Sequence, residues 1–103
     1  MLKVYDVVIE MLKELRPVLD QIGRRDKELE GQLRRAATSV PLNIAEGSGS
    51  RGNNRGARYA TALGSAREVG AILDSAVALG YIEQAPVRER LHQVIGTLVK
   101  VTR

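Results

Sequence analysis

Apolar residues recur every three or four positions along most of the chain, the spacing that places them on one face of an α-helix. In the first segment, residues 2–22, they are Val4, Val8, Met11, Leu15 and Leu19. In the second segment, residues 26–46, they are Leu33, Ala36, Val40 and Ile44. No segment alternates apolar and polar residues between hairpin turns, as strands do. The pattern therefore predicts an all-α protein.

The first two predicted helices each contain an internal proline. The first ends at Gly23 and carries Pro17 well inside it, where the missing N–H and the ring predict a kink or break. The second begins after Asp26, a favourable N-cap, and carries Pro41. Because Pro41 cannot donate a hydrogen bond to the carbonyl of Ala37, that carbonyl loses its helical partner.

Two further helices follow a loop at 47–54 that is rich in glycine, serine and asparagine. Asn53 or Asn54 is the predicted cap of the third helix, which ends at Gly80. Its apolar seam alternates spacings of four and three, as in helix bundles, and consists of Tyr59, Leu63, Ala66, Gly70, Leu73, Val77 and Gly80. The fourth helix begins at Pro86, a favoured first position, and its apolar residues are Val87, Leu91, Val94, Leu98 and Val101. We predict one domain, residues 1–103, folded as an up-down four-helix bundle.

The polar residues around Pro41 are unusual for a helix that needs only to be stable. We interpret the following as a structural motif that bends the helix and forms a buried network: Ser39, Pro41, Asn43, Glu46 and Gly47. Hydroxyl and amide groups beside the proline could bond the freed backbone or a neighbouring helix. Glu46 opposes the dipole at the end of the helix, so Arg58 or Arg67 is its predicted partner. The alternative is that the motif contacts a ligand directly.

Small residues form two stripes on the third helix. Gly56, Ala60 and Gly64 line one side, and Ala62, Ala66 and Gly70 line another. Glycine inside a helix costs about 1 kcal/mol relative to alanine, so these glycines indicate that another backbone comes close. One stripe serves the bundle. The second predicts a neighbour outside it, most simply another copy of the chain.

The excess positive charge of the protein is confined to one third of the sequence. The formal net charge is +4, and residues 24–58 carry all of it. This stretch contains eight basic and four acidic residues, whereas the rest of the chain contains equal numbers of each. Seven of those eight cations are arginine, whose planar fork suits phosphate and carboxylate. The charge therefore indicates an anionic partner, with an ordinary solvated surface as the alternative.

No motif predicts catalysis, a metal or a cofactor. The chain has no cysteine, its acids lack metal-ligand spacing, and the single histidine, His92, has no catalytic neighbour in sequence. Residues 47–52 match GxGxxG, but they follow a helix, whereas the dinucleotide fingerprint follows a strand. No apolar run is long enough for a membrane span and no secretion signal is present. We expect a soluble, cytoplasmic, non-enzymatic protein with no membrane partner.

Aromatic residues on which bases could stack are almost absent. The only ones are Tyr5, Tyr59 and Tyr81. Proteins that bind single strands usually stack bases on aromatic rings. Any nucleic-acid binding by this chain would therefore be mainly electrostatic, sensitive to salt and weak in sequence preference.

The motif around Pro41 resembles the signature of a known bacterial family. Residues 29–49, with Ser-Val-Pro-Leu-Asn-Ile-Ala-Glu-Gly at 39–47, together with 58–59, 63–68 and 76–81, resemble the four-helix bundle proteins encoded in intervening sequences of 23S ribosomal RNA genes and at other bacterial loci. The chain departs from the common pattern at 56–60, where a phenylalanine-bearing segment is usual and this chain has none.

This resemblance implies a homo-oligomeric barrel, typically a pentamer, and kinship with the accessory proteins of diversity-generating retroelements, which bind a reverse transcriptase and its RNA. It carries over no catalytic residues. We therefore expect a homo-oligomeric scaffold that binds nucleic acid, RNA rather than DNA, as an accessory factor to a reverse transcriptase. The predicted phosphate contacts are Arg34, Arg35, Arg51, Arg55 and Arg58. The alternative is an adaptor ring that docks a partner enzyme without binding nucleic acid itself.

Overall fold

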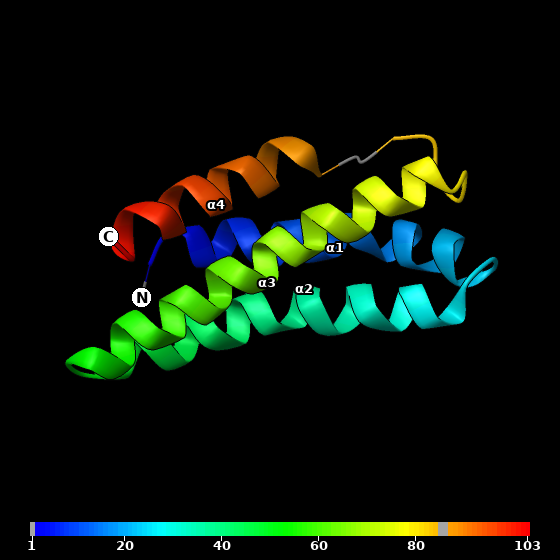
Figure 1. Ribbon diagram of the computed structural model, residues 1–103. Coiled ribbons are helices and arrows are strands. Elements are labelled where there is room, and N and C mark those ends of the chain that lie inside the picture. The colour runs from blue at the N-terminus through cyan, green and yellow to red at the C-terminus, as the bar shows by residue number, and fades with distance from the viewer. Residues whose placement is uncertain (1, 85–86) are drawn as a thin grey trace.

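The structure is a computed structural model that describes residues 2–84 and 87–103, and these residues form helices and no strand (Figure 1). The helices are α1 (Val4–Gly23), α2 (Lys27–Ser48), α3 (Asn53–Ala78) and α4 (Arg88–Val101). The predicted all-α class is confirmed. Pro86, the predicted first residue of the fourth helix, lies outside the described residues.

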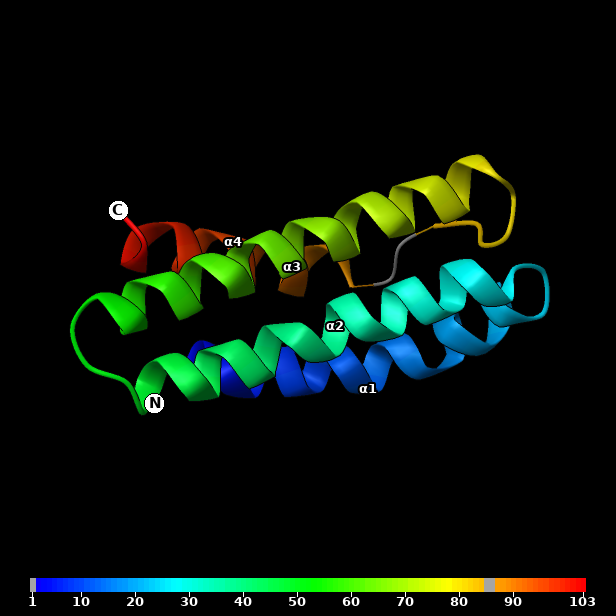
Figure 2. The same ribbon diagram turned by 60° about the horizontal axis from the view of Figure 1, so that its bottom comes forward.

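The helices run alternately up and down along an elongated molecule of 43 × 23 × 20 Å (Figures 1 and 2). Helix α2 packs against α1 and α3, and α4 packs against α3 and α1. At 14 residues, α4 is much shorter than the 26-residue α3 and covers only the half of the bundle nearest the termini. In the connection between α3 and α4, Ile82 and Val87 are buried and contribute to the core.

The predicted apolar stripes of α1 and α2 form the core almost as expected. All four predicted positions of α2 are buried, as are Val4, Val8, Met11 and Leu15 of α1. Leu19 is only half-buried, and Val18 and Ile22 complete the buried face of α1 instead. The buried positions of α1 alternate spacings of four and three throughout, the period of bundle packing, so the buried position after Leu15 is Val18 and not Leu19.

The buried face of α3 is wider than the single seam predicted for it. Tyr59, Ala66 and Leu73 are buried, but Leu63, Gly70 and Val77 are half-buried. The buried residues absent from the prediction are Ala62, Val69, Ile72 and Ala76. Because α3 packs against both α2 and α4, two seams of this helix are buried. Gly80 is exposed and ends the helix with a φ of 79°, in the left-handed region that favours glycine.

Neither internal proline interrupts its helix. Helix α1 continues through Pro17 and α2 through Pro41, so the chain does not break at either proline. A proline inside a helix costs about 3 kcal/mol through the lost hydrogen bond and the clash of its ring. The neighbouring side chains Leu15 and Val40 are fully buried, and burial of such side chains stabilises each helix by a comparable amount.

One carboxylate organises the turn between α1 and α2. Asp26 is the N-cap of α2, as predicted, and its Oδ1 accepts a hydrogen bond from the Leu29 N–H at 2.9 Å. Its Oδ2 accepts a hydrogen bond from the Tyr81 hydroxyl at 3.2 Å, and the Arg25 guanidinium lies 5.5 Å from the centre of the Tyr81 ring. Asp26 thereby ties this turn to the connection between α3 and α4.

Partial burial, the hydrogen bond to Asp26 and its negative charge raise the pKa of Tyr81 above 10.0, whereas the charge of Arg25 lowers it. A raised pKa means that the folded chain favours the neutral phenol. The contact therefore stabilises the fold at neutral pH and is lost as the pH rises through that pKa.

Replacing Asp26 with alanine is expected to lower the free energy of unfolding by about 1 kcal/mol, because the first turn of α2 loses its cap. Tyr81→Phe removes only the second bond of the same carboxylate and is expected to cost less. Urea unfolding of both variants measures the difference. Equal losses would mean that the cap contributes nothing.

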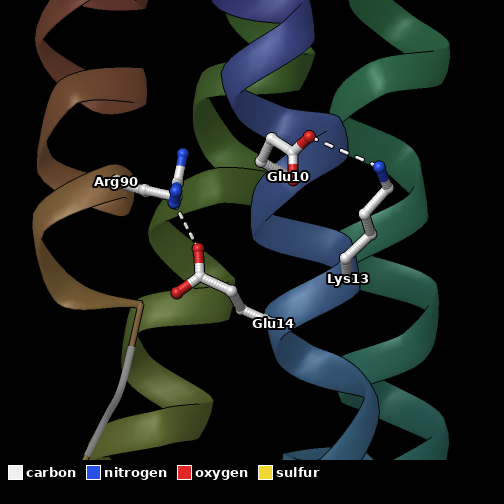
Figure 3. Close-up of polar contacts among 4 residues, drawn as sticks. All are labelled: Glu10, Lys13, Glu14 and Arg90. Carbon is white, nitrogen blue, oxygen red and sulfur yellow. Dashed lines mark hydrogen bonds and ion pairs between the residues drawn. The ribbon is translucent and has the colours of Figure 1, made fainter.

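Among the described residues, one ion pair joins α4 to α1. Arg90 pairs through Nε with Glu14 Oε1 across the two helices, whereas the pair of Lys13 with Glu10, at 3.3 Å, stays within α1 (Figure 3). Pairs this exposed contribute little stability.

Candidate nucleic-acid interface

The five arginines predicted to contact phosphate lie in two separate groups, and all five are exposed. Arg34 and Arg35 lie midway along α2. The others surround the turn between α2 and α3, at the end of the bundle that also holds both termini (Figure 1): Arg51, Arg55 and Arg58. The rise of an α-helix puts about 20 Å between Arg35 and the end of α2. The fold thus brings three of the predicted residues together and leaves two apart.

The two arginines of α2 differ in their surroundings. Arg34 pairs with Glu30 one turn earlier, with 2.6 Å between Nη2 and Oε2, so part of its charge is neutralised within the helix. Arg35 forms no ion pair in the described part of the chain. Of these two, Arg35 is the better placed for an external anion.

Glu46 does not have the partner that the sequence predicted. It is exposed, and neither Arg58 nor Arg67 pairs with it in residues 2–84. That prediction was wrong. All three side chains are exposed, and water satisfies such charges at little cost in free energy.

Two other members of the motif around Pro41 join α2 to α3. Ser39 Oγ accepts a hydrogen bond from Ser65 Oγ of α3 at 2.8 Å and another from Asn43 Nδ2 at 3.0 Å. The same Asn43 amide donates to the Ser39 carbonyl at 2.9 Å. These bonds support the structural interpretation of Ser39 and Asn43. The partner Ser65 was not predicted, because only the fold brings it within reach.

The bonds of the motif do not go to the carbonyl that Pro41 deprives of a partner. Thr38 Oγ1 donates to the carbonyl of Arg34 at 2.9 Å, and Asn43 donates to that of Ser39. None of the motif's hydroxyl or amide groups reaches the carbonyl of Ala37. Pro41 itself is buried, so its ring contributes to packing.

Gly47 lies inside α2 and not, as predicted, at the start of the loop, and packing requires a glycine there. Helix α2 continues to Ser48, and Gly47 is buried within it. A Cβ at this position would lie 2.5 Å from Cε1 and 2.7 Å from Cδ1 of Tyr59. The ring of Tyr59 therefore packs directly on the backbone of α2, and only glycine leaves room for it.

The start of α3 is strongly positive. No acidic residue occurs anywhere in 47–67, although this stretch contains four arginines. The helix begins at Asn53 after Gly52, whose φ is 60°. Gly52 occupies the cap position in place of the predicted asparagine and has no side chain with which to cap the helix. Cations at a helix N-terminus oppose the helix dipole. An external anion bound here would relieve this repulsion.

A protein-family model described as 23S rRNA-intervening sequence protein matches residues 1–101. The chain belongs to this family. The match includes α1 to α4 and both groups of arginines, and it confirms the resemblance noted in the motif around Pro41. Comparison with curated proteins and with solved structures finds no match.

The described residues show no cluster of metal-ligating side chains. They contain no group of three His, Cys, Asp or Glu side chains placed to hold a metal ion. His92 is exposed on α4. Within the same residues, no helix has the length and apolar character needed to cross a bilayer.

Proposed function

We propose that this protein is a non-enzymatic, homo-oligomeric scaffold of the cytoplasm that binds RNA through the exposed arginines at the start of α3. The observation that carries the proposal is the positive end of the bundle. Arg51, Arg55 and Arg58 surround one turn, no acid occurs in residues 47–67, and the preceding acid, Glu46, pairs with none of the three. Arginine clusters of this kind attract a polyanion at long range and bind its phosphates.

The burial of the aromatic residues supports RNA binding through phosphates rather than through stacked bases. Tyr59 is only 6% exposed, Tyr5 is half-buried, and the ring of Tyr81 lies beneath Arg25. Little aromatic surface is therefore left for stacking. The preference for RNA over DNA rests on the family description, which names 23S rRNA.

Self-association is supported by the outer side of α3. A solvated helix normally has a polar outer face. Here most exposed positions of one stripe are small and uncharged: Ala57, Ala60, Gly64, Ala71, Ser75 and Ala78. A Cβ at Gly64 would meet no atom within 4 Å, so nothing inside the chain explains that glycine. A second copy of the chain packed on this side of α3 would explain it.

In the pentamer that the resemblance implies, five protomers of +4 would carry about +20.

Binding to a labelled RNA hairpin is expected to weaken steeply with salt, because each neutralised phosphate adds about 0.9 to the slope of log K against log salt. The triple variant R51Q/R55Q/R58Q is expected to reduce that slope by about 2 to 3 for each protomer in contact. Fluorescence anisotropy across a salt series measures both effects. The control K13Q/R16Q/R88Q removes the same charge from exposed positions of α1 and α4.

An RNA that stays unbound by the wild-type protein at low salt would contradict the proposal. Equal weakening by the two triple variants would show that net charge, not the turn, is responsible.

A second candidate is an adaptor ring that docks a protein partner, such as a reverse transcriptase. It is favoured by Leu42 and Leu79, large apolar side chains that are 64% and 57% exposed. If R51Q/R55Q/R58Q loses co-purification with the partner while the RNA affinity of the wild type is already negligible, the adaptor function is the correct one.

A further inference from the structure

A hollow of about 240 Å³ lies where the end of α2 meets the start of α3. It is lined by Leu2, Ser48, Arg55 and Tyr59. Its polar groups are therefore two hydroxyls and one guanidinium, and no carboxylate is among them. Such a donor set, with one positive charge and no acid, is suited to an anion that carries several acceptor oxygens.

The two hydroxyls leave one proton available to a ligand. Ser48 Oγ and Tyr59 Oη lie 3.2 Å apart and share one hydrogen bond. Each hydroxyl has one proton, so one of the two donates to its neighbour and the other keeps its proton for a further acceptor. Tyr59 is 6% exposed and Ser48 is half-buried, so their positions are fixed by packing.

Arg55 is held beside this pair by the loop. Its Nη2 donates to the Ser50 carbonyl at 3.2 Å, which orients the guanidinium across the turn. Four of its five N–H donors take no part in that bond. Arg51 and Arg58 add positive charge on the same turn.

We propose that this hollow is a phosphate subsite, in which Arg55 and the Ser48–Tyr59 hydroxyl pair bind one phosphate of the RNA backbone. The proposal rests on the RNA-binding function and gives it a defined contact. Leu2 supplies an apolar wall suited to the adjoining sugar. The subsite adds directional hydrogen bonds to what is otherwise an electrostatic interface.

The shared proton gives the subsite a non-additive signature. Ser48→Ala and Tyr59→Phe each remove one hydroxyl, but the remaining hydroxyl is then free to donate to the phosphate. Each single variant is expected to change RNA affinity by less than about twofold, whereas S48A/Y59F is expected to weaken it about tenfold. The double variant leaves the net charge intact, so the salt slope stays unchanged.

The matched control is T102V/Y81F, which removes one aliphatic and one tyrosine hydroxyl outside the hollow. Thr102 donates to the Leu98 carbonyl and Tyr81 to Asp26, so both hydroxyls are engaged within the chain. This control is expected to leave RNA affinity unchanged. Thermal unfolding of all variants checks that the loss in S48A/Y59F does not follow from unfolding, because Tyr59→Phe keeps the aromatic ring that packs on α2.

RNA anisotropy separates the possible outcomes. A tenfold loss confined to S48A/Y59F supports the subsite. If S48A/Y59F binds RNA as tightly as the wild type does, the subsite proposal is wrong, but the RNA-binding function is not contradicted. If the wild-type protein does not bind RNA, both proposals are wrong. Inorganic phosphate, titrated against chloride at equal ionic strength, tests the source of the phosphate: if it displaces the RNA fully, the hollow selects the free anion and the assignment to the RNA backbone is wrong.

Discussion

Replacing Gly47 with alanine is expected to lower the free energy of unfolding by about 2 to 3 kcal/mol, the range of an overpacked core. Alanine normally stabilises a helix relative to glycine. Here the added Cβ would lie 2.5 Å from the ring of Tyr59, a distance that real Cβ contacts do not show. The ring is buried and cannot move aside without displacing α3. Urea unfolding measures the loss.

Gly96→Ala is the matched control for this prediction. Gly96 lies in α4, is exposed, and has no atom within 4 Å of where its Cβ would be. The same substitution there is expected to raise the free energy of unfolding by about 0.5 to 1 kcal/mol. A double-mutant cycle isolates the clash, because Gly47→Ala should cost almost nothing once Tyr59 is also replaced by alanine. Equal effects at both glycines would refute the packing account.

The contact of Gly47 with Tyr59 connects the family motif to the candidate site. Ser39, Asn43 and Gly47 are spaced four residues apart and therefore share one face of α2. Ser39, which accepts a hydrogen bond from Asn43, also accepts one from Ser65 of α3, and Gly47 receives the ring of Tyr59. The motif is thus a docking surface for α3. By fixing Tyr59 it also fixes the start of α3, where the arginines lie.

Sequence periodicity was sufficient for the helices, because each helix is specified by local spacing. The apolar stripe of α2 and the cap at Asp26 were predicted correctly for this reason. The predicted partner of Glu46 was wrong, because these side chains are exposed and water satisfies their charges, and of the kink or break predicted at Pro17 the break does not occur. A proline can remain inside a helix when buried neighbours on both sides hold the backbone in place.

The candidate site was predictable only as a set of charges. The excess of arginine in residues 24–58 was visible in the sequence, but its division into two groups depends on the length of α2. Ser48 was assigned to a loop and Tyr59 to a core seam. Their hydroxyls meet only because α2 runs past Glu46 and α3 folds back on it. No local pattern connects residues 11 positions apart across a turn.

The last prediction concerns the outer side of α3. Gly64→Glu is expected to convert the oligomer to monomers, because every interface of a closed ring would bury a carboxylate among small residues. An uncompensated buried charge costs about 3 to 5 kcal/mol, which weakens each interface more than about a hundredfold. The folded monomer should not suffer, because glutamate forms helix better than glycine and Gly64 is exposed within the chain. Sedimentation velocity measures the assembly.

Gly96→Glu introduces the same charge at the exposed glycine of α4, where a Cβ would also meet nothing within 4 Å. It is expected to leave the oligomer intact. A monomeric wild type would refute self-association, and an intact Gly64→Glu oligomer would place the interface elsewhere. If the monomeric variant also binds RNA more than about tenfold less tightly than Gly96→Glu, which has equal charge, the arginine turns of several protomers act together, since linked sites raise the effective concentration for one another.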